Sequence, residues 1–278
     1  MEQIKENLGK NYEIVKCCIC NIPPKLWASD YHGNYLSKCP SCGLRFVNPR
    51  LKSEVLAEKV YTPTYYHNER FDPKNIKISE ATLFPIKVLK KYKSSGSLFD
   101  VSAGNGTFLL AAKQNGYNIS GSEIKKNQSE LLAKLLGCKI YTGYIETLEI
   151  KEKYDIVTFI HVLEHTSNPV IFLKKCISML EKDGMLYGLF PNTKSLSDRF
   201  KTFLSDYGLK NKKYKHLSAD HHLWFFDLKT TIKLFKQIEG IEVLSLRTMV
   251  NPAKHNLFSS ILEKTGLATW IEIVAKKN

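Results

Sequence analysis

The stretch "SLFDVSAGNGTFLLAA", residues 97–112, decides the fold. A short apolar run ends in Asp100, passes through small residues that include Gly104 and Gly106, and continues with apolar side chains at helical spacing. Glycines at the end of a strand allow a ligand to approach the backbone closely. The stretch therefore predicts a strand, a tight turn and a helix, with a ligand bound at the turn.

Strands and helices alternate along the chain from this point. Apolar runs predict strands over residues 97–101, 119–123, 139–141, 154–160 and 184–190. Helical spacing predicts helices over residues 76–93, 106–115, 126–136, 168–180 and 229–237. The alternation is typical of an α/β domain with a parallel sheet. Residues 194–220, long and lysine-rich, interrupt it after a strand end, where open sheets bind ligands, and we expect them to form a lid.

Two phosphate-binding motifs do not fit the glycine turn. No Gly-Lys-Ser/Thr follows it, so it is not a nucleoside-triphosphate loop. The dinucleotide pattern G-x-G-x-x-G is incomplete, because Leu109 stands at the position of its third glycine. A ligand without a phosphate group is expected at this turn.

Side chains at the strand ends indicate which ligand this is. Asp100 can hold a cationic ammonium group, and Glu123, at the end of the second strand, can accept both hydroxyls of a ribose. Tyr144 and Ile145 follow the third strand and can flank an adenine. A ribose, an adenine and an amino-acid zwitterion together describe S-adenosylmethionine.

Four motifs carry a family resemblance. "DVSAGNGTFL", "SGSEI", "IHVLEHTSNP" and "GLFPN" occur in the order and spacing of class I S-adenosylmethionine-dependent methyltransferases, which the chain resembles over about residues 95–278. The resemblance implies methyl transfer by a Rossmann-like domain, a mostly parallel seven-stranded sheet flanked by helices. It implies cofactor contacts from Asp100, Ser102, Gly104, Gly106, Glu123, Tyr144, Ile145 and His161. Ser102 departs from the family, which has its first glycine there.

The motif "HVLEH" offers a catalytic group. His165 follows the fourth strand, and the pKa of an ordinary histidine suits proton removal near neutral pH. In a second interpretation, His161, Glu164 and His165 share one helix face and hold a divalent cation, as in some related O-methyltransferases. A structural or cofactor-packing role is the third interpretation.

Three aromatic residues are expected on the substrate side. The resemblance aligns His222 and Trp224 with the family motif H-L-W-x-F, which implies contact with the substrate. An aromatic anchor at a helix start is the alternative. Tyr66, in an aromatic-rich linker, is expected to close over the bound ligands, or else to pack on the sheet.

Four cysteines have the spacing of a structural metal site. Cys17 and Cys20 form one C-x2-C pair, and Cys39 and Cys42 form a second one 18 residues later. Two such pairs complete a closed Zn²⁺ tetrahedron, with Cys18 as an alternative to Cys17. We exclude disulfides because the polar start of the chain is no secretory signal. The expected organisation is a zinc-ribbon-like segment over 1–52, a helical linker or cap over 53–94 and the methyltransferase domain over 95–278.

The charge of the chain leaves its partner open. Its 41 Lys and Arg against 27 Asp and Glu give a net charge of +14. Residues 96–193 are balanced, so the excess lies in the flanks, and only five of the basic residues are arginines. A solvated lysine-rich surface and a contact surface for an anionic substrate both fit. No apolar stretch reaches the roughly 20 residues of a membrane span, and we expect a cytoplasmic protein.

These observations favour an S-adenosylmethionine-dependent methyltransferase that acts on a small hydroxylated metabolite, such as a sugar or a nucleotide-linked sugar. Some relatives with a similar cysteine segment methylate sugar carbons, although they carry a further carboxy-terminal domain. The alternatives are an RNA methyltransferase, which the basic flanks favour, and a non-catalytic module that binds S-adenosylmethionine and interacts through its zinc ribbon. Oxygen, carbon and nitrogen acceptors all occur on this scaffold.

Overall fold

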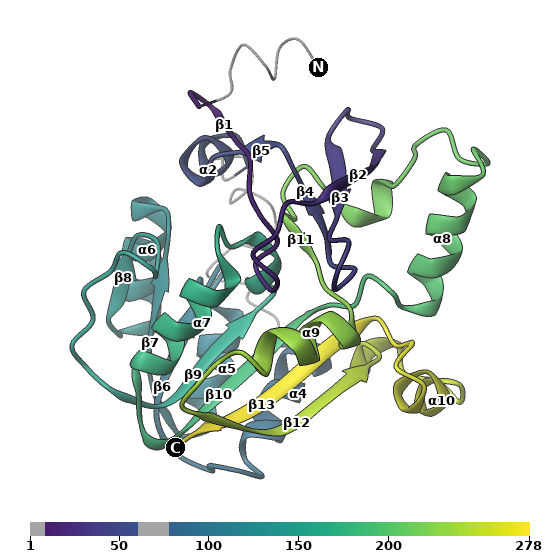
Figure 1. The fold of residues 1–278 in the computed structure, drawn as a ribbon. Coiled ribbons are helices and arrows are strands. Elements are labelled where there is room, and N and C mark those ends of the chain that lie inside the picture. Colours follow the sequence, from purple (N-terminus) through teal and green to yellow (C-terminus); the bar gives the residue numbers. More distant parts are fainter. Residues whose placement is uncertain (1–8, 61–77) are drawn as a thin grey trace.

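The structure, a computed structural model, describes residues 9–60 and 78–278. Its largest element is a seven-stranded sheet with the order β12-β13-β10-β9-β6-β7-β8 (Figure 1). The strands are β6 (Gly96–Val101), β7 (Tyr117–Glu123), β8 (Ile140–Thr142), β9 (Tyr154–Ile160), β10 (Leu180–Pro191), β12 (Ile241–Met249) and β13 (Trp270–Lys277). The strands from β6 to β10 pair in parallel, whereas β13 runs antiparallel to both of its neighbours. The predicted fold class is confirmed.

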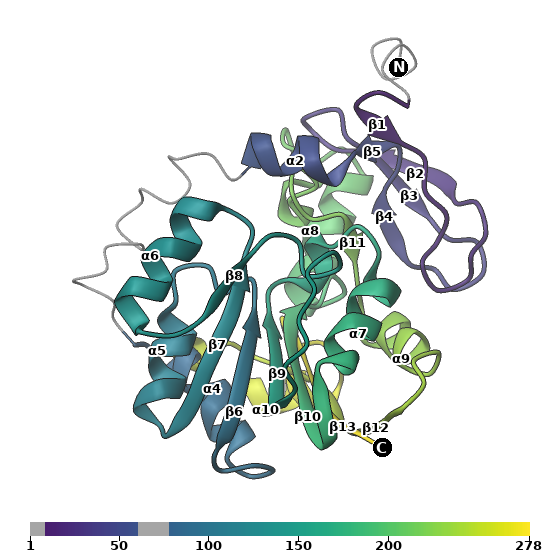
Figure 2. The same cartoon turned by 90° about the vertical axis from the view of Figure 1, so that its left-hand side faces the viewer.

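Helices cover both faces of this sheet (Figure 2). Successive residues of a strand point to opposite faces, so Leu98 joins one apolar core and Phe99 the other. Against the first core pack α4 (Glu80–Leu89), α5 (Thr107–Gln114) and α6 (Lys126–Leu136), and against the second pack α7 (Pro169–Ser178) and α9 (Leu228–Phe235). The helix predicted from residue 168 starts there, because the Asn168 side chain accepts hydrogen bonds from two backbone N–H groups of the first turn.

The amino-terminal strands form a small second sheet that the large domain completes. β2 (Lys25–Ser29), β3 (Tyr35–Lys38) and β4 (Arg45–Val47) are followed in space by β11 (Trp224–Phe225), which lies far along the chain. β1 (Tyr12–Glu13) pairs separately with β5 (Arg50–Leu51), and α2 (Ser53–Val60) follows. Because β11 pairs with β4, the two sheets belong to one packed molecule (Figure 1).

The segment expected to form a lid contains α8 (Leu196–Asp206) and the short 3-10 helix η3 (Lys215–Leu217). Near the carboxyl end, η4 (Pro252–Lys254) and α10 (Ser259–Lys264) lie between β12 and β13. Within the described ranges, no helix combines the length and apolar character that crossing a bilayer requires.

Candidate functional site

The carboxyl ends of β6 and β7 bring the predicted cofactor carboxylates together. Asp100 is buried and accepts a hydrogen bond of 2.6 Å from the Thr158 hydroxyl. Glu123 is also buried and accepts hydrogen bonds from the backbone N–H groups of Gly104, at 3.0 Å, and Ile124, at 2.8 Å. The carboxylate at the end of one strand therefore holds the glycine turn that follows the other.

The glycine turn has a backbone that favours residues without a side chain. Ser102, Gly104 and Gly106 all have positive φ angles, of 55°, 58° and 75°. A Cβ atom at Gly106 would lie 2.6 Å from Cδ2 of Leu132 on α6, so only glycine fits there without rearrangement. Ser102 adopts the left-handed conformation in which the family has glycine, which costs a non-glycine residue about 1–2 kcal/mol.

Burial strongly affects the titration of Asp100. Burial is the main cause that raises the pKa of this carboxyl to about 7; the hydrogen bond from Thr158 opposes the rise and the nearby Glu123 adds to it. An ammonium group bound beside Asp100 favours the ionised carboxylate.

A pocket opens beside this turn at the carboxyl edge of the sheet. Of the residues predicted from the sequence, it is lined by Ser102, Tyr144, Ile145, His161 and His165. The apolar side of α2 forms one wall through Leu56, Ala57 and Val60, and His221 contributes from the segment before β11. The Tyr144 hydroxyl donates a hydrogen bond of 3.1 Å to the Ser53 carbonyl, which joins α2 to the predicted adenine subsite.

The motif "HVLEH" places a buried carboxylate beside this pocket. Glu164 lies in the 3-10 helix η2 (Leu163–His165) and is 3% exposed, and among the described residues neither of its carboxylate oxygens has a hydrogen-bond partner. Its Oε1 lies 3.7 Å from Nδ1 of His161 and 3.8 Å from Nε2 of His165. A buried carboxylate without a hydrogen bond is costly unless a cation balances it.

His222 comes close to Glu164 although the two are far apart in the sequence. Ligand-type atoms of Glu164, His165 and His222 all lie within 4.8 Å of one another, which defines the Glu164 cluster. His222 is therefore the third member of this cluster. The cation site predicted from the sequence has His161 in that place, beside Glu164 and His165. No local spacing signals this proximity, because the pairing of β11 with β4 positions the segment before β11.

Backbone contacts fix the orientation of both histidines in the cluster. Nδ1 of His165 lies 3.0 Å from the His221 carbonyl oxygen, and Nδ1 of His222 lies 3.2 Å from that of Leu217. A carbonyl oxygen only accepts, so each Nδ1 carries the proton and each Nε2 keeps a lone pair. Burial lowers the pKa of His165 and lowers that of His222 to about 3, so both rings are neutral near pH 7.

One described residue expected on the substrate side, Trp224, lies outside the pocket lining. Trp224 is buried, is not among the residues that line the pocket, and donates a hydrogen bond of 2.8 Å from Nε1 to the Thr166 carbonyl. Its position matches the alternative interpretation, an aromatic anchor. Tyr66 lies outside the described residues.

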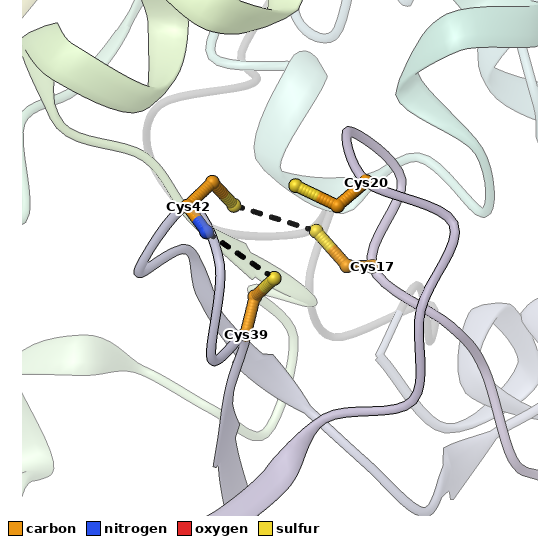
Figure 3. Close-up of side chains that lie close together, drawn as sticks. All are labelled: Cys17, Cys20, Cys39 and Cys42. Carbon is orange, nitrogen blue, oxygen red and sulfur yellow. Dashed lines mark hydrogen bonds between the residues drawn. The ribbon is translucent and has the colours of Figure 1, made fainter.

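The four predicted cysteines converge in the amino-terminal sheet (Figure 3). The sulfur atoms of Cys17, Cys20, Cys39 and Cys42, here the thiol cluster, lie within 4.8 Å of one another, and those of Cys17 and Cys42 are 3.5 Å apart. A Zn²⁺ ion bound by four thiolates at about 2.3 Å separates the sulfurs by about 3.8 Å. The donor set and its spacing fit zinc, as expected of a zinc-ribbon-like extension, and Cys18 is not part of it.

Two buried arginines connect the amino-terminal strands to the loops around the pocket. Arg50 bonds Glu13 at 2.8 Å and donates a hydrogen bond of 2.6 Å to the carbonyl of Ser167, directly after η2. Arg45 donates to the carbonyl of Thr193, after β10, at 2.9 Å. The strands that carry the thiols therefore also hold the segments that carry the candidate catalytic groups.

Comparison with known proteins agrees with this geometry. Residues 76–246 match the family described as methyltransferase domain. Over 94 residues the chain is 27% identical to the ubiquinone biosynthesis O-methyltransferase of Nitrobacter winogradskyi; the match covers 32% of this chain and only 36% of that protein.

Solved structures resemble the fold over most of the chain. One is an S-adenosylmethionine-dependent methyltransferase of Thermotoga maritima, described as a possible histamine N-methyltransferase, with a TM-score of 0.54, 18% identity, and coverage of 80% of this chain and 99% of that one. Another is the 1,6-didemethyltoxoflavin-N1-methyltransferase of Burkholderia thailandensis, with a TM-score of 0.57, 12% identity, and coverage of 91% and 99%. The chain belongs to the methyltransferase-domain family, its fold is that of the class I S-adenosylmethionine-dependent methyltransferases, and its thiol cluster fits a zinc-ribbon-like amino-terminal extension.

Proposed function

We propose that this protein transfers a methyl group from S-adenosylmethionine to a hydroxyl group of a small metabolite of the sugar or nucleotide-sugar class. One observation carries the proposal: His165 lines the pocket beside the glycine turn, and its Nε2 has a free lone pair because Nδ1 is held by the His221 carbonyl. A neutral imidazole in that orientation can take the proton of a hydroxyl during the transfer.

The proposed cofactor subsite uses the residues at the ends of β6, β7 and β8. Asp100 binds the ammonium group, Glu123 accepts from the ribose, and Tyr144 and Ile145 flank the adenine. The positive φ angles of the glycine turn bring its backbone close to the ligand. His161 and Ser102, which line the same pocket, contact the methionine part. The sulfonium of the cofactor supplies an activated methyl group, so the protein mainly has to align the two reactants.

The walls of the pocket support a small acceptor. Apolar side chains of α2 line it, and so does His221 from the segment before β11. Hydroxyl-rich metabolites suit a wall that combines histidine and serine side chains with a few apolar ones. His222 borders His165, with ring centroids 4.8 Å apart, and we assign it a role in the Glu164 cluster next to the acceptor.

The Glu164 cluster suits a divalent cation. It offers an unpaired buried carboxylate and two imidazoles whose Nε2 atoms are free. The backbone carbonyls on both Nδ1 atoms are the outer partners that metal-bound histidines usually have. A cation held by Glu164, His165 and His222 would supply Lewis acidity to an acceptor hydroxyl. His165 would then serve as a ligand rather than as the free base.

The thiol cluster suits a structural Zn²⁺ ion. Four thiolates leave no open coordination position, so this ion would stabilise the amino-terminal strands and take no part in the transfer. The backbone N–H of Leu44 points to the sulfur of Cys42 at 3.4 Å, a contact that stabilises a thiolate.

Methyl transfer from radiolabelled S-adenosylmethionine into a cell extract tests the proposal, with the products separated into small molecules, RNA and protein. We expect label in the small-molecule fraction, lost with His165→Ala and retained with His255→Ala, an exposed histidine outside the pocket. Binding of S-adenosylmethionine by His165→Ala shows that the variant is folded. Label in RNA, or label that survives His165→Ala, would contradict the proposed acceptor or the proposed base.

A further inference from the structure

Two surface segments carry most of the exposed apolar side chains. Among the described residues, eleven large apolar side chains are exposed by half or more, and eight of them lie in or next to α8 and α10. These eight are Leu196, Phe200, Phe203, Tyr207, Leu209, Leu257, Phe258 and Ile261. Exposed apolar side chains that gather on neighbouring segments mark an interaction site more often than scattered ones do.

The apolar side chains of α8 form one stripe that faces the solvent. Leu196, Phe200, Phe203 and Tyr207 follow one another at intervals of four, three and four residues, which places them along one line of a helix. Their exposure ranges from 50% to 71%, whereas the only buried residue of α8 is Ser205. No residue of α8 lines the pocket. These apolar side chains therefore neither pack into a core nor line the pocket.

A basic groove adjoins the start of this helix. The cationic side chains that line it are Lys194, Arg199, Lys229, Lys233 and Lys236. The acidic residue in the lining, Asp227, is paired with Lys194. The groove is therefore strongly cationic, and the half-exposed Ile232 adds an apolar side chain within it.

Hydrogen bonds join the apolar stripe, the groove and α10 into one surface. The backbone N–H of Leu196 donates to the Leu267 carbonyl at 2.9 Å, and the Asn192 side chain donates to the Gly266 carbonyl at 3.1 Å. Figure 1 shows α8 and α10 along the same edge of the molecule. We call this surface, formed by the eight apolar residues and the five cationic groove residues, the α8–α10 face.

We propose that the α8–α10 face binds an anionic lipid membrane. Apolar side chains on a helix enter the boundary between headgroups and acyl chains, and adjacent lysines bind the anionic headgroups. The face offers both kinds of side chain next to each other, and its charge complements that of such a membrane. Of the two acidic residues of α8, Asp198 pairs with Lys201, and the single charge of Asp206 is outweighed by the five cationic groove residues.

Other occupants fit the same surface less well. A second copy of the chain in a symmetric dimer would bring the cationic groove close to its own copy, where like charges repel. A nucleic acid would use the lysines and stack on aromatic rings, but it leaves the aliphatic Leu196, Leu257 and Ile261 without a partner. The inference is independent of the acceptor proposed for methyl transfer.

Vesicle flotation with the full chain tests the inference. We expect binding to vesicles of phosphatidylcholine with 30% phosphatidylglycerol and none to phosphatidylcholine alone, with loss of binding at high salt. Phe200→Ser with Phe203→Ser should lower the bound fraction at least tenfold. Each of Lys229→Gln and Lys233→Gln should weaken binding about fivefold, because a lysine near an anionic surface contributes about 1 kcal/mol.

Matched variants on another helix control for a general loss of apolar surface or charge. Leu131→Ser with Leu135→Ser changes two exposed apolar residues of α6, and Lys126→Gln changes an exposed lysine there. We expect these variants to bind like the wild type, and all variants to keep the wild-type melting temperature. Equal losses in the α6 variants would overturn the inference. The inference would also be overturned if binding of the wild type did not depend on phosphatidylglycerol. Dimerisation through Phe200 and Phe203, or binding to RNA without binding to vesicles, would overturn it as well.

Discussion

The thiol cluster and the Glu164 cluster both gather metal-type ligands, but they differ in donors and surroundings. The thiol cluster is built from two local C-x2-C turns and offers four sulfurs, a set that closes around its ion. The Glu164 cluster combines one carboxylate with two imidazoles from separate loops, and His165 also lines the pocket. The thiol cluster suits a structural ion. The Glu164 cluster suits an ion that can still be reached by a ligand bound in the pocket.

The residues that would stabilise the fold and those proposed to take part in the transfer thus lie in different clusters. The amino-terminal strands are short, and their buried apolar residues pack with residues of the large domain, so a metal can supply stability that these strands lack by themselves. The large sheet has two apolar cores and can tolerate an unpaired carboxylate near its edge. Replacements in each cluster should therefore affect different properties of the protein.

The largest expected effect comes from breaking the thiol cluster. Cys39→Ser should release the zinc and unfold the amino-terminal strands, since a structural zinc site contributes on the order of 10 kcal/mol to folding in isolated fingers. Metal analysis should find one zinc per wild-type chain and none in the variant, and limited proteolysis should cut the variant within residues 9–52. Cys138→Ser, a thiol outside the cluster, is the control. Wild-type protein that folds without zinc would contradict the assignment.

Glu164→Gln should instead leave the fold intact and remove the cation. The amide lacks the charge that a divalent ion requires, so we expect kcat/KM to fall about a hundredfold, the scale of an interaction made in the transition state. Stimulation by Mg²⁺ or Mn²⁺ should disappear, while binding of S-adenosylmethionine and the zinc content stay unchanged. Glu152→Gln, at an exposed ion pair, should have no effect. A wild-type enzyme that is insensitive to chelators would leave His165 as a base without a metal.

Replacement of Arg50 tests whether the amino-terminal strands position the candidate site. Arg50→Met removes the hydrogen bond to the Ser167 carbonyl and the partner of Glu13. We expect the free energy of unfolding to fall by about 2 kcal/mol, as for the loss of a buried charged hydrogen bond, and kcat to fall as η2 loses its support. Denaturant unfolding measures the first effect, with Arg199→Ala, an exposed arginine, as the control. An unchanged kcat would show that the amino-terminal strands do not position the site.

Asp100 belongs to neither cluster, and it should make the affinity for S-adenosylmethionine depend on pH. Its pKa is raised to about 7, so the ionised form that binds an ammonium grows as the pH rises through 7. Between pH 6.0 and 7.5 the affinity for S-adenosylmethionine should rise roughly eightfold, over a range where an α-ammonium stays mostly protonated. Calorimetry at several pH values measures this rise, and Asp100→Asn should abolish it. The same slope in the variant would assign the dependence to another group.

The smallest expected effect is at Ser102. Ser102→Gly removes the strain of a positive φ angle and restores the glycine of the family, and it should stabilise the fold by up to about 1 kcal/mol. Thermal unfolding measures the gain, and Ser97→Gly, within β6, should destabilise instead. A loss of cofactor affinity in Ser102→Gly would mean that the serine hydroxyl binds the cofactor.

Local patterns in the sequence predict the parts of the molecule that are built locally. The glycine turn, the strands from β6 to β10 and the C-x2-C pairs all depend on residues close together in the chain, and the structure confirms these elements. The strands β12 and β13 also have apolar, β-branched runs, IEVLSL and WIEIVA, but no strand is predicted there from these residues, and only the family resemblance implies a seven-stranded sheet.

Contacts between distant segments account for what the sequence could not predict. His222 comes close to Glu164 because the Leu223 backbone N–H donates to the Glu164 carbonyl at 2.8 Å and β11 pairs with β4, and Trp224 is buried in the same region. The apolar stripe of α8 has the spacing of a core-facing helix, yet it faces outward because α8 stands away from the sheet. Spacing predicts that a helix has an apolar side, and only the tertiary structure shows which way that side points.

The pairing of β11 with β4 also sets an order of events during synthesis. The amino-terminal strands are made before β11, and their sheet gains its fourth strand only after residues 224–225 have been made. Contacts between such distant segments form late, because a long stretch of chain has to be ordered first. The small sheet is thus completed late, and until then a bound metal ion would be its main support.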